Sequence, residues 1–192
     1  GAPVDERVFS RAVDALKRVL RSDYAGLSRA FRYNQQTAAV RALARIGQLD
    51  EHYLVDLFHR RGEMDLTSVA DLAATMSARP DLFRNNLAAL ETDLWNSVVT
   101  KLHRGKTVFE GLRWRRSGWT GGYLGSRTST VAAVFESLLL VDPDDQRHAL
   151  LRDALLAYGS AAGGFGSTHD NRRALTALSL YLERAKTSAP NI

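Results

Sequence analysis

One acidic run in the chain contains residues that could carry out acid catalysis. Asp142-Pro143-Asp144-Asp145 places three carboxylates within four residues. A carboxylic acid whose pKa is raised in an apolar cavity can protonate an alkene. The same run also suits a helix start, with Asp142 as the N-cap and Pro143 as the first helical residue. Asp144 and Asp145 would then lie at the positive end of the helix dipole. Because this assignment accounts for every residue, the sequence favours a helix start over a catalytic acid.

The other titratable residues form no catalytic or metal-binding pattern. Five further carboxylates could serve in acid–base chemistry, and spacing singles out none of them: Asp65, Asp71, Asp93, Glu110 and Glu136. His52 and His59 lie about 10 Å apart along one helix, too far to share one metal ion. For His169, a packing or hydrogen-bonding role is expected rather than catalysis. The chain contains no cysteine, and it has no phosphate-binding glycine loop or Gly-x-Ser-x-Gly motif. It therefore predicts no catalytic residue, no metal and no cofactor.

A glycine segment is the most informative part of the chain. It runs Gly163-Gly164-Phe165-Gly166-Ser167-Thr168-His169 and leads into a helix of small and apolar residues. Glycines allow positive φ and a close approach of the backbone. Ser167 can cap the helix, with Asp170 as the acidic partner of a capping box. A weaker copy, 121–126, lies 41 residues earlier. A repeated turn-plus-helix unit is typical of a helical repeat architecture.

A segment rich in arginine and tryptophan is the candidate for contact with a partner. It comprises Arg113, Trp114, Arg115, Arg116 and Trp119. Both residue types are enriched at the centres of protein interfaces, although large aromatic side chains also serve to anchor loops. The net charge of +5 is compatible with an anionic partner. Most other basic residues, such as Arg41, stand singly on polar helix faces, so nucleic acid is not expected as a partner.

Apolar residues recur at helical spacing along most of the chain. They predict helices over 5–22, 34–47, 50–61, 65–78, 80–104, 127–141, 143–158 and 168–185. Gly47 suits the position after the second helix, and Pro80 stops the fourth. Residues 105–126 break the pattern and are expected to form a long ordered loop or a short hairpin insertion. The 192 residues are predicted to form one all-α domain, 1–192.

Two classes of helix alternate along the sequence. Four helices are rich in Ala, Thr and Ser: 34–47, 65–78, 127–141 and 168–185. Their partners over 5–22, 50–61 and 143–158 carry more Arg, Asp and Glu. Small residues let helices pack closely, so the first class suits an inner layer and the charged class an outer layer. The alternation predicts stacked antiparallel helical hairpins with inner and outer helices, curved or closed into an α/α toroid.

The glycine segment and its helix resemble the closing segment of the thioester domain of alpha-2-macroglobulins and complement proteins. That family reads Gly-Gly-aromatic-Gly-Ser-Thr-Gln, with Ala-Leu-x-x-Tyr following. The matching positions are Gly163, Gly164, Phe165, Gly166, Ser167, Thr168, His169 and Tyr181. Helices further back are also similar, so the resemblance spans about 33–185 and has a bacterial character. The matching positions are structural in the family, and no catalytic residue is carried over.

The resemblance implies a fragment of an α/α toroid within a much larger bacterial protease inhibitor. Such inhibitors are periplasmic and often anchored to the membrane by lipid. A protease cuts a bait region, the inhibitor changes shape, and a Cys–Gln thioester captures the protease by acyl transfer. The chain would then be a non-catalytic structural domain. Its partners would be other domains of the parent protein and, through the parent, target proteases.

The chain departs from the family pattern at two points. The motif Cys-x-Glu-Gln is absent, so either the chain begins after it or the parent has no thioester. His169 stands where the family has glutamine. The first helix pairs of the toroid also have no counterpart, so an incomplete ring is expected. Its apolar surface along Val8–Leu20 would be exposed and would favour self-association.

Two other functions are alternatives to this interpretation. A toroid enzyme of the terpene cyclase or prenyltransferase type would need Asp142, Asp144 and Asp145 to point into a deep cavity. A helical scaffold that binds an anionic partner would use the arginine- and tryptophan-rich residues 113–119.

Overall fold

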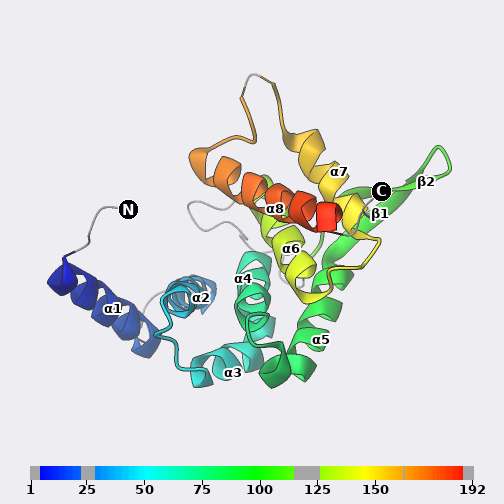
Figure 1. Cartoon of the computed structure of the whole chain (residues 1–192). Coiled ribbons are helices and arrows are strands. Elements are labelled where there is room, and N and C mark those ends of the chain that lie inside the picture. Colours follow the sequence, from blue (N-terminus) through cyan, green and yellow to red (C-terminus); the bar gives the residue numbers. More distant parts are fainter. Residues whose placement is uncertain (1–4, 23–28, 115–125, 162, 188–192) are drawn as a thin grey trace.

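The computed structural model describes residues 5–22, 29–114, 126–161 and 163–187. Within these residues the chain forms eight α-helices, one 3-10 turn and one β-hairpin (Figure 1). The elements are α1 (Glu6–Arg21), α2 (Arg29–Arg45), α3 (His52–His59), η1 (Arg61–Glu63), α4 (Leu66–Met76), α5 (Pro80–Ser97), β1 (Val98–His103), β2 (Lys106–Leu112), α6 (Arg127–Val141), α7 (His148–Tyr158) and α8 (Thr168–Thr187). The predicted predominance of helix is confirmed. No helix in the described residues is long and apolar enough to cross a membrane.

Local sequence signals set most helix ends. Gly47 follows α2 with φ +69°, and the next amide, of Gln48, donates to Leu43 O at 2.9 Å, as in a Schellman motif. Pro80 begins α5, where its missing N–H costs nothing. Asp65 caps α4 by accepting the Ser68 N–H at 2.7 Å.

The helix predicted over 80–104 is wrong in its last part. α5 ends at Ser97, and residues 98–103 form β1. The run begins with the β-branched residues Val98, Val99 and Thr100, which favour strand over helix. Arg104 and Gly105 both have positive φ, 51° and 76°, as a two-residue hairpin turn requires. The predicted short hairpin therefore exists, but it begins inside the predicted helix. Residues 115–125 lie outside the described part.

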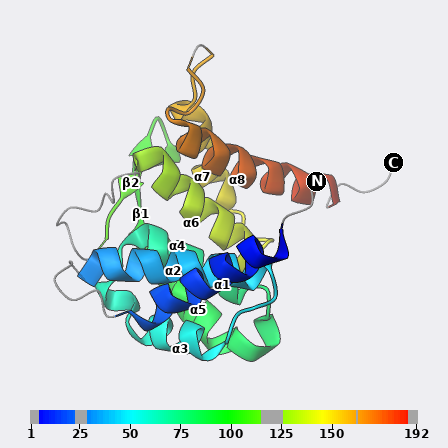
Figure 2. The ribbon, with the colours of Figure 1, turned by 90° about the vertical axis from the view of Figure 1, so that its left-hand side faces the viewer.

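Helices α2, α4, α6 and α8 lie side by side in one row (Figure 2). Side-chain hydrogen bonds join their N-terminal parts. Asn34 of α2 accepts from Ser68 of α4, and Thr67 of α4 lies 3.2 Å from Thr130 of α6 between hydroxyl oxygens. The N-cap of α6 is likewise bonded to the first turn of α8. The four helices of the row therefore run parallel.

The remaining helices return the chain from one row helix to the next. α3 contacts both α2 and α4, α5 contacts α4 and α6, and α7 packs on α6. The core lies in the middle of the row, where nine of the 11 residues of α4 and ten of the 15 residues of α6 are buried. The small-residue helices predicted to be inner are thus the four that form the row.

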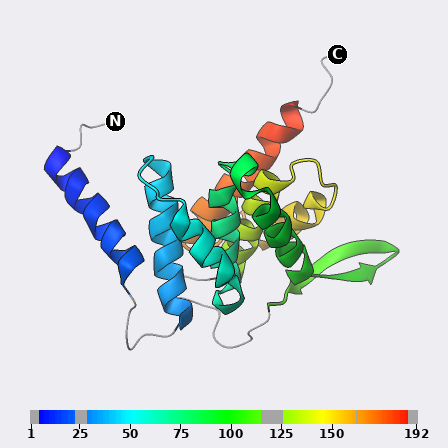
Figure 3. The ribbon, with the colours of Figure 1, turned by 90° about the horizontal axis from the view of Figure 1, so that it is seen from below.

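α1 stands at one end of the molecule, beside α2, and the hairpin lies at the other (Figure 3). Val13 and Leu20 are the buried residues of α1. Val8 and Phe9 are 50% and 43% exposed, and Ala12 is exposed beside them. The apolar surface expected along Val8–Leu20 is therefore exposed only in its N-terminal part, because α2 covers the rest of the apolar side.

We expect the chain to self-associate weakly through this apolar surface. Sedimentation velocity should show a weight-average mass that rises with protein concentration, because association removes the apolar surface from water. Val8→Ser combined with Phe9→Ser should suppress that rise. Leu182→Ser serves as the control, because Leu182 is also exposed, at 58%, but lies on α8. A rise that survives the α1 double variant would contradict the prediction.

Candidate functional site

The glycine segment forms a tight turn that leads directly into α8. Ser160 and Gly164 exchange backbone hydrogen bonds of 2.8 and 3.0 Å, and the Gly163 N–H donates to the Ser160 hydroxyl at 2.9 Å. Gly164 and Gly166 have φ of +59° and +115°, which favours glycine. A Cβ added at Gly164 would overlap Asn171 Oδ1. Backbone conformation and close packing therefore both require glycine at 164.

Asn171 holds this turn from the first part of α8. Its Oδ1 accepts the Phe165 N–H at 2.9 Å. Its Nδ2 donates to the carbonyls of Gly166 and Ser167 at 3.2 and 3.0 Å. An amide side chain offers both donors and an acceptor, so one residue satisfies three backbone groups. The sequence did not single out Asn171, although this residue directly follows the capping residue Asp170.

The predicted capping box at the start of α8 is confirmed. Ser167 Oγ accepts the Asp170 N–H at 3.2 Å, and Asp170 Oδ2 accepts the Ser167 N–H at 3.1 Å. The other oxygen of Asp170 accepts from the Ser126 hydroxyl, and Ser126 is the N-cap of α6. The two copies of the repeated turn are therefore joined through their capping residues.

Electrostatics favour the charged form of Asp170. Burial by itself would raise the pKa of this carboxyl, but the hydrogen bonds from Ser126 and Ser167 outweigh burial. The net pKa lies below the ordinary value of 3.8. A carboxylate at this position also faces the positive ends of α6 and α8. Asp170 is thus a charged structural anchor.

Three further residues of the motif, His169, Thr168 and Phe165, differ in their surroundings. Burial, with Arg173 and Arg172 nearby, lowers the pKa of His169, so the imidazole is neutral at pH 7. Thr168 is exposed at the start of α8. The Phe165 ring packs against the core.

Tyr181 ties α8 to its neighbours at the other end of the helix. Its hydroxyl accepts from Arg152 of α7 at 2.8 Å. Its ring centroid lies 5.7 Å from that of Phe135 in α6. The motif tyrosine therefore connects three helices, as a structural residue would.

Four charged residues meet in the middle of the row, and each row helix contributes one. We refer to Arg41 of α2, Asp71 of α4, Glu136 of α6 and Arg173 of α8 as the inner charge cluster. Arg173 binds both oxygens of Asp71 at 2.7 Å. Arg41 binds Glu136 at 2.6 Å and also contacts Asp71. Arg173 lies 3.8 Å from the second oxygen of Glu136.

The inner charge cluster is balanced, with two cations and two anions, and it is nearly closed to solvent. Asp71, Glu136 and Arg173 are 8%, 7% and 8% exposed. The prediction that Arg41 stands singly on a polar helix face is therefore wrong. Both carboxylates are occupied by guanidinium groups, so the geometry favours a structural role over a general acid and base. Spacing could not reveal the cluster, because its members come from four separate helices.

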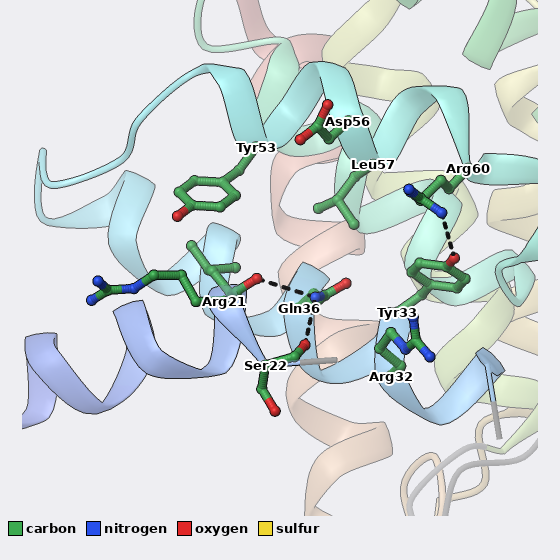
Figure 4. A pocket seen from close by; sticks show the side chains of 10 residues that line it. Arg21, Ser22, Arg32, Tyr33, Gln36, Tyr53, Asp56, Leu57 and Arg60 are labelled. Atoms are coloured by element: carbon green, nitrogen blue, oxygen red, sulfur yellow. Dashed lines mark hydrogen bonds between the residues drawn. The ribbon is translucent and has the colours of Figure 1, made fainter. Parts of the chain in front are cut away.

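Several cavities in the described residues adjoin the row, and two of them are lined by arginines of α2. One, of about 250 Å³, is lined by Arg41 and Glu136 together with small residues of α2 and α4. The other, of about 240 Å³, lies between the end of α1, α2 and α3 (Figure 4). Its arginines, Arg21, Arg32 and Arg60, do not point toward one another, and Arg60 donates to the Tyr33 hydroxyl at 3.5 Å. The second cavity is therefore not a clamp for one anion.

The acidic run at 142–145 does not begin a helix, so that prediction is wrong. Asp142 is the C-cap of α6, and α7 begins only at His148. The reason lies in Asp145, whose carboxylate accepts the Arg147 N–H at 2.8 Å and pairs with the Arg147 guanidinium at 2.5 Å. These contacts close a turn before the helix starts.

The carboxylates of this run gather at the surface with Glu91 of α5. Ligand oxygens of Glu91, Asp142 and Asp145 lie within 4.8 Å of one another. Burial and the two aspartates raise the pKa of Glu91, whereas the hydrogen bond from Arg147 lowers that of Asp145. These three residues are partly exposed, and Asp144 is exposed. An acid that protonates an alkene requires a deep apolar cavity, which this surface turn does not provide.

The described part of the arginine- and tryptophan-rich segment is anchored to the body. Trp114 Nε1 donates to Met64 O at 2.9 Å, and its ring packs against the core. The amide of Arg113, whose side chain is exposed, donates to Ser97 O at 2.7 Å. Arg115, Arg116 and Trp119 lie outside the described residues. Trp114 therefore anchors the loop, as large aromatic side chains often do.

The glycine turn yields one prediction on stability. Gly164→Ala should lower the free energy of unfolding more than Gly47→Ala does. Both glycines have φ near +60°, but a Cβ at Gly47 meets nothing within 4 Å. Gly47→Ala should therefore cost only about 1–2 kcal/mol of backbone strain, and Gly164→Ala adds the overlap with Asn171. Chemical denaturation measures both. Equal losses would show that Asn171 moves aside without cost.

The inner charge cluster yields a second prediction. Arg173→Met should destabilise the protein by about 3–5 kcal/mol, because it leaves a buried excess negative charge. Adding Asp71→Leu restores the balance and should recover much of the loss. Arg172→Met, on the exposed side of α8, is the matched control. Urea denaturation of the parent chain, the two single variants and the double variant measures their free energies of unfolding. A loss in Arg173→Met no larger than the loss in Arg172→Met would contradict the prediction.

Similarity to a known structure extends over the whole row of helices. No family model matches the chain, and no curated protein sequence matches it. Among solved structures, it is similar to trypsin-activated alpha-2-macroglobulin from Escherichia coli, with a TM-score of 0.59 and 18% identity. The match covers 94% of this chain and 11% of that chain. The chain thus has the fold of a small part of an alpha-2-macroglobulin.

Proposed function

We propose that this chain is a helical domain of a bacterial alpha-2-macroglobulin-like protease inhibitor, the C-terminal part of its thioester-type α/α toroid. The observation that carries the proposal is the fold similarity over 94% of the chain to an activated alpha-2-macroglobulin. The glycine segment supports it independently, because defined structural contacts are made by five residues of the shared motif, Gly163, Gly164, Phe165, Ser167 and Tyr181.

The proposed role of the domain is structural. Its row of parallel helices packs against other domains of the parent protein before bait cleavage and moves with the parent on activation. Target proteases are partners through the parent. The domain itself is proposed to be non-enzymatic, since Asp71 and Glu136 are bound by arginines and the surface carboxylates lack a deep cavity. A periplasmic location, with a lipid anchor on the parent, belongs to the same proposal.

The row of helices is proposed to be an arc of the toroid. In this arrangement α2, α4, α6 and α8 are inner helices, and α1, α3, α5 and α7 are outer. Leu175 and Leu182 on α8 are 55% and 58% exposed, and α8 contacts α6 on one side. An exposed apolar edge at the last helix is what an arc, rather than a closed ring, would present.

The native polypeptide provides the test. An antiserum raised against this chain is used on source cells to determine the size, the location and the peptide map of the protein that contains it. We expect a periplasmic polypeptide several times larger than 21.2 kDa. After incubation with trypsin, the purified protein should block cleavage of protein substrates and spare small peptide substrates, because an enclosed protease remains accessible only to small molecules.

The same purification separates the alternatives. A Cys-x-Glu-Gln peptide upstream of this chain, together with covalent trypsin complexes, would establish thioester capture. Inhibition without covalent complexes would indicate a relative that lacks the thioester. A native polypeptide near 21.2 kDa without effect on trypsin would contradict the proposal.

A further inference from the structure

The β1–β2 hairpin projects from the helical body, and only its base is covered (Figure 1). Val98, Phe109 and Leu112, near the base, pack against the core. Every residue from 100 to 107 is exposed. A two-stranded hairpin with no support beneath it is marginally stable in water, so its length beyond the body needs an explanation.

The projecting part is strongly basic and carries one exposed leucine. Lys101, His103, Arg104 and Lys106 lie within six residues. His103 pairs with Lys106 in the register, so these side chains share one face of the hairpin with Lys101. Lys101 lies 3.8 Å from Glu110, which offsets one positive charge. Leu102, on the opposite face, is 77% exposed.

The turn of the hairpin keeps an arginine where another residue would fit better. Arg104 has φ of 51°, within the left-handed region, where a side chain with a Cβ costs about 1–2 kcal/mol. Two-residue turns of this kind favour asparagine, aspartate or glycine at that position. The strained backbone therefore coincides with the cation that lies furthest from the body, and strain of this kind gathers at binding sites.

The outer edges of the two strands differ. In the described residues β1 and β2 pair only with each other, so each has one edge without a neighbouring strand. On β2, the Glu110 carbonyl accepts from Arg127 Nη2 at 2.9 Å, and α7 contacts the strand. Among the residues that the structure describes, no hydrogen bond reaches the outer edge of β1 beyond its base. An open strand edge is a template for another strand.

We propose that β1 is a docking edge for an extended acidic segment of a partner protein, which adds to the hairpin as a third strand. Backbone hydrogen bonds to β1 supply affinity, acidic side chains face Lys101, Arg104 and Lys106, and the segment covers Leu102. Pairing of two copies would bring like charges together. A lipid surface would leave the strand edge without hydrogen-bond partners. The inference is independent of the proposed protease inhibition.

A synthetic peptide of alternating valine and glutamate is the probe. A second peptide carries proline in place of valine, which retains the charge and cannot form a strand ladder. In NMR titrations, the valine peptide should bind saturably and shift amide signals of residues 98–106. The proline peptide should bind more weakly. Equal binding of both peptides, or no binding of the valine peptide, would overturn the proposal.

Variants in the turn provide the second arm. Arg104→Glu with Lys106→Glu should weaken binding at least about tenfold, because facing like charges cost more than the 1.4 kcal/mol that a factor of ten represents. Arg45→Glu with Arg172→Glu, on exposed helix positions, is the matched control and should retain binding. Unchanged binding in the turn variant would overturn the proposal.

Arg104→Asn guards against loss of the hairpin itself. Asparagine tolerates positive φ, so this variant should be at least as stable as the parent chain. It should nevertheless bind the valine peptide more weakly than the parent chain does. Vesicles of phosphatidylglycerol test whether a membrane surface binds to the hairpin instead. Vesicle binding that depends on Arg104 and Lys106, without peptide binding, would replace the protein partner by a membrane surface and overturn the proposal.

Discussion

The inner charge cluster is the interaction on which the row of helices depends. Parallel helices place like ends of their dipoles side by side, so their alignment needs compensation from side chains. Arg41, Asp71, Glu136 and Arg173 connect all four helices at mid-height. A buried ion-pair network contributes little net stability relative to apolar packing, but it is costly to break or misalign. The cluster therefore fixes the relative height of the helices more than it stabilises them.

The ends of the helices complete this arrangement. Short polar side chains join neighbouring N-termini, and Asp170 adds a negative charge where two positive helix ends meet. The small residues of the row allow the helices to approach closely enough for these short side chains to touch. Small residues, capping residues and one central charge cluster are thus three parts of one solution to parallel packing.

Local signals in the sequence predicted what local physics decides. The helix spacing, the glycine after α2 and the capping box of Ser167 and Asp170 all involve residues within one or two turns of each other. Two predictions were wrong because a nearby alternative was stronger. β-branched residues and the Arg104–Gly105 turn ended α5 early, and Asp145 closed a turn on Arg147 before α7. The inner charge cluster could not be predicted, since Arg41 and Glu136 are brought together only by the packing of separate helices.

The isolation of α1 sets an order of unfolding. This helix buries Val13 and Leu20 and packs mainly on α2, whereas α4 and α6 are buried over most of their length. Opening α1 exposes less apolar surface than opening α4 or α6, so its amide hydrogens are expected to exchange with solvent before those of the row. The row must open as one cooperative unit, because the charge cluster spans all its members. The molecule therefore combines a cooperative block of helices with one helix, α1, that is expected to open first.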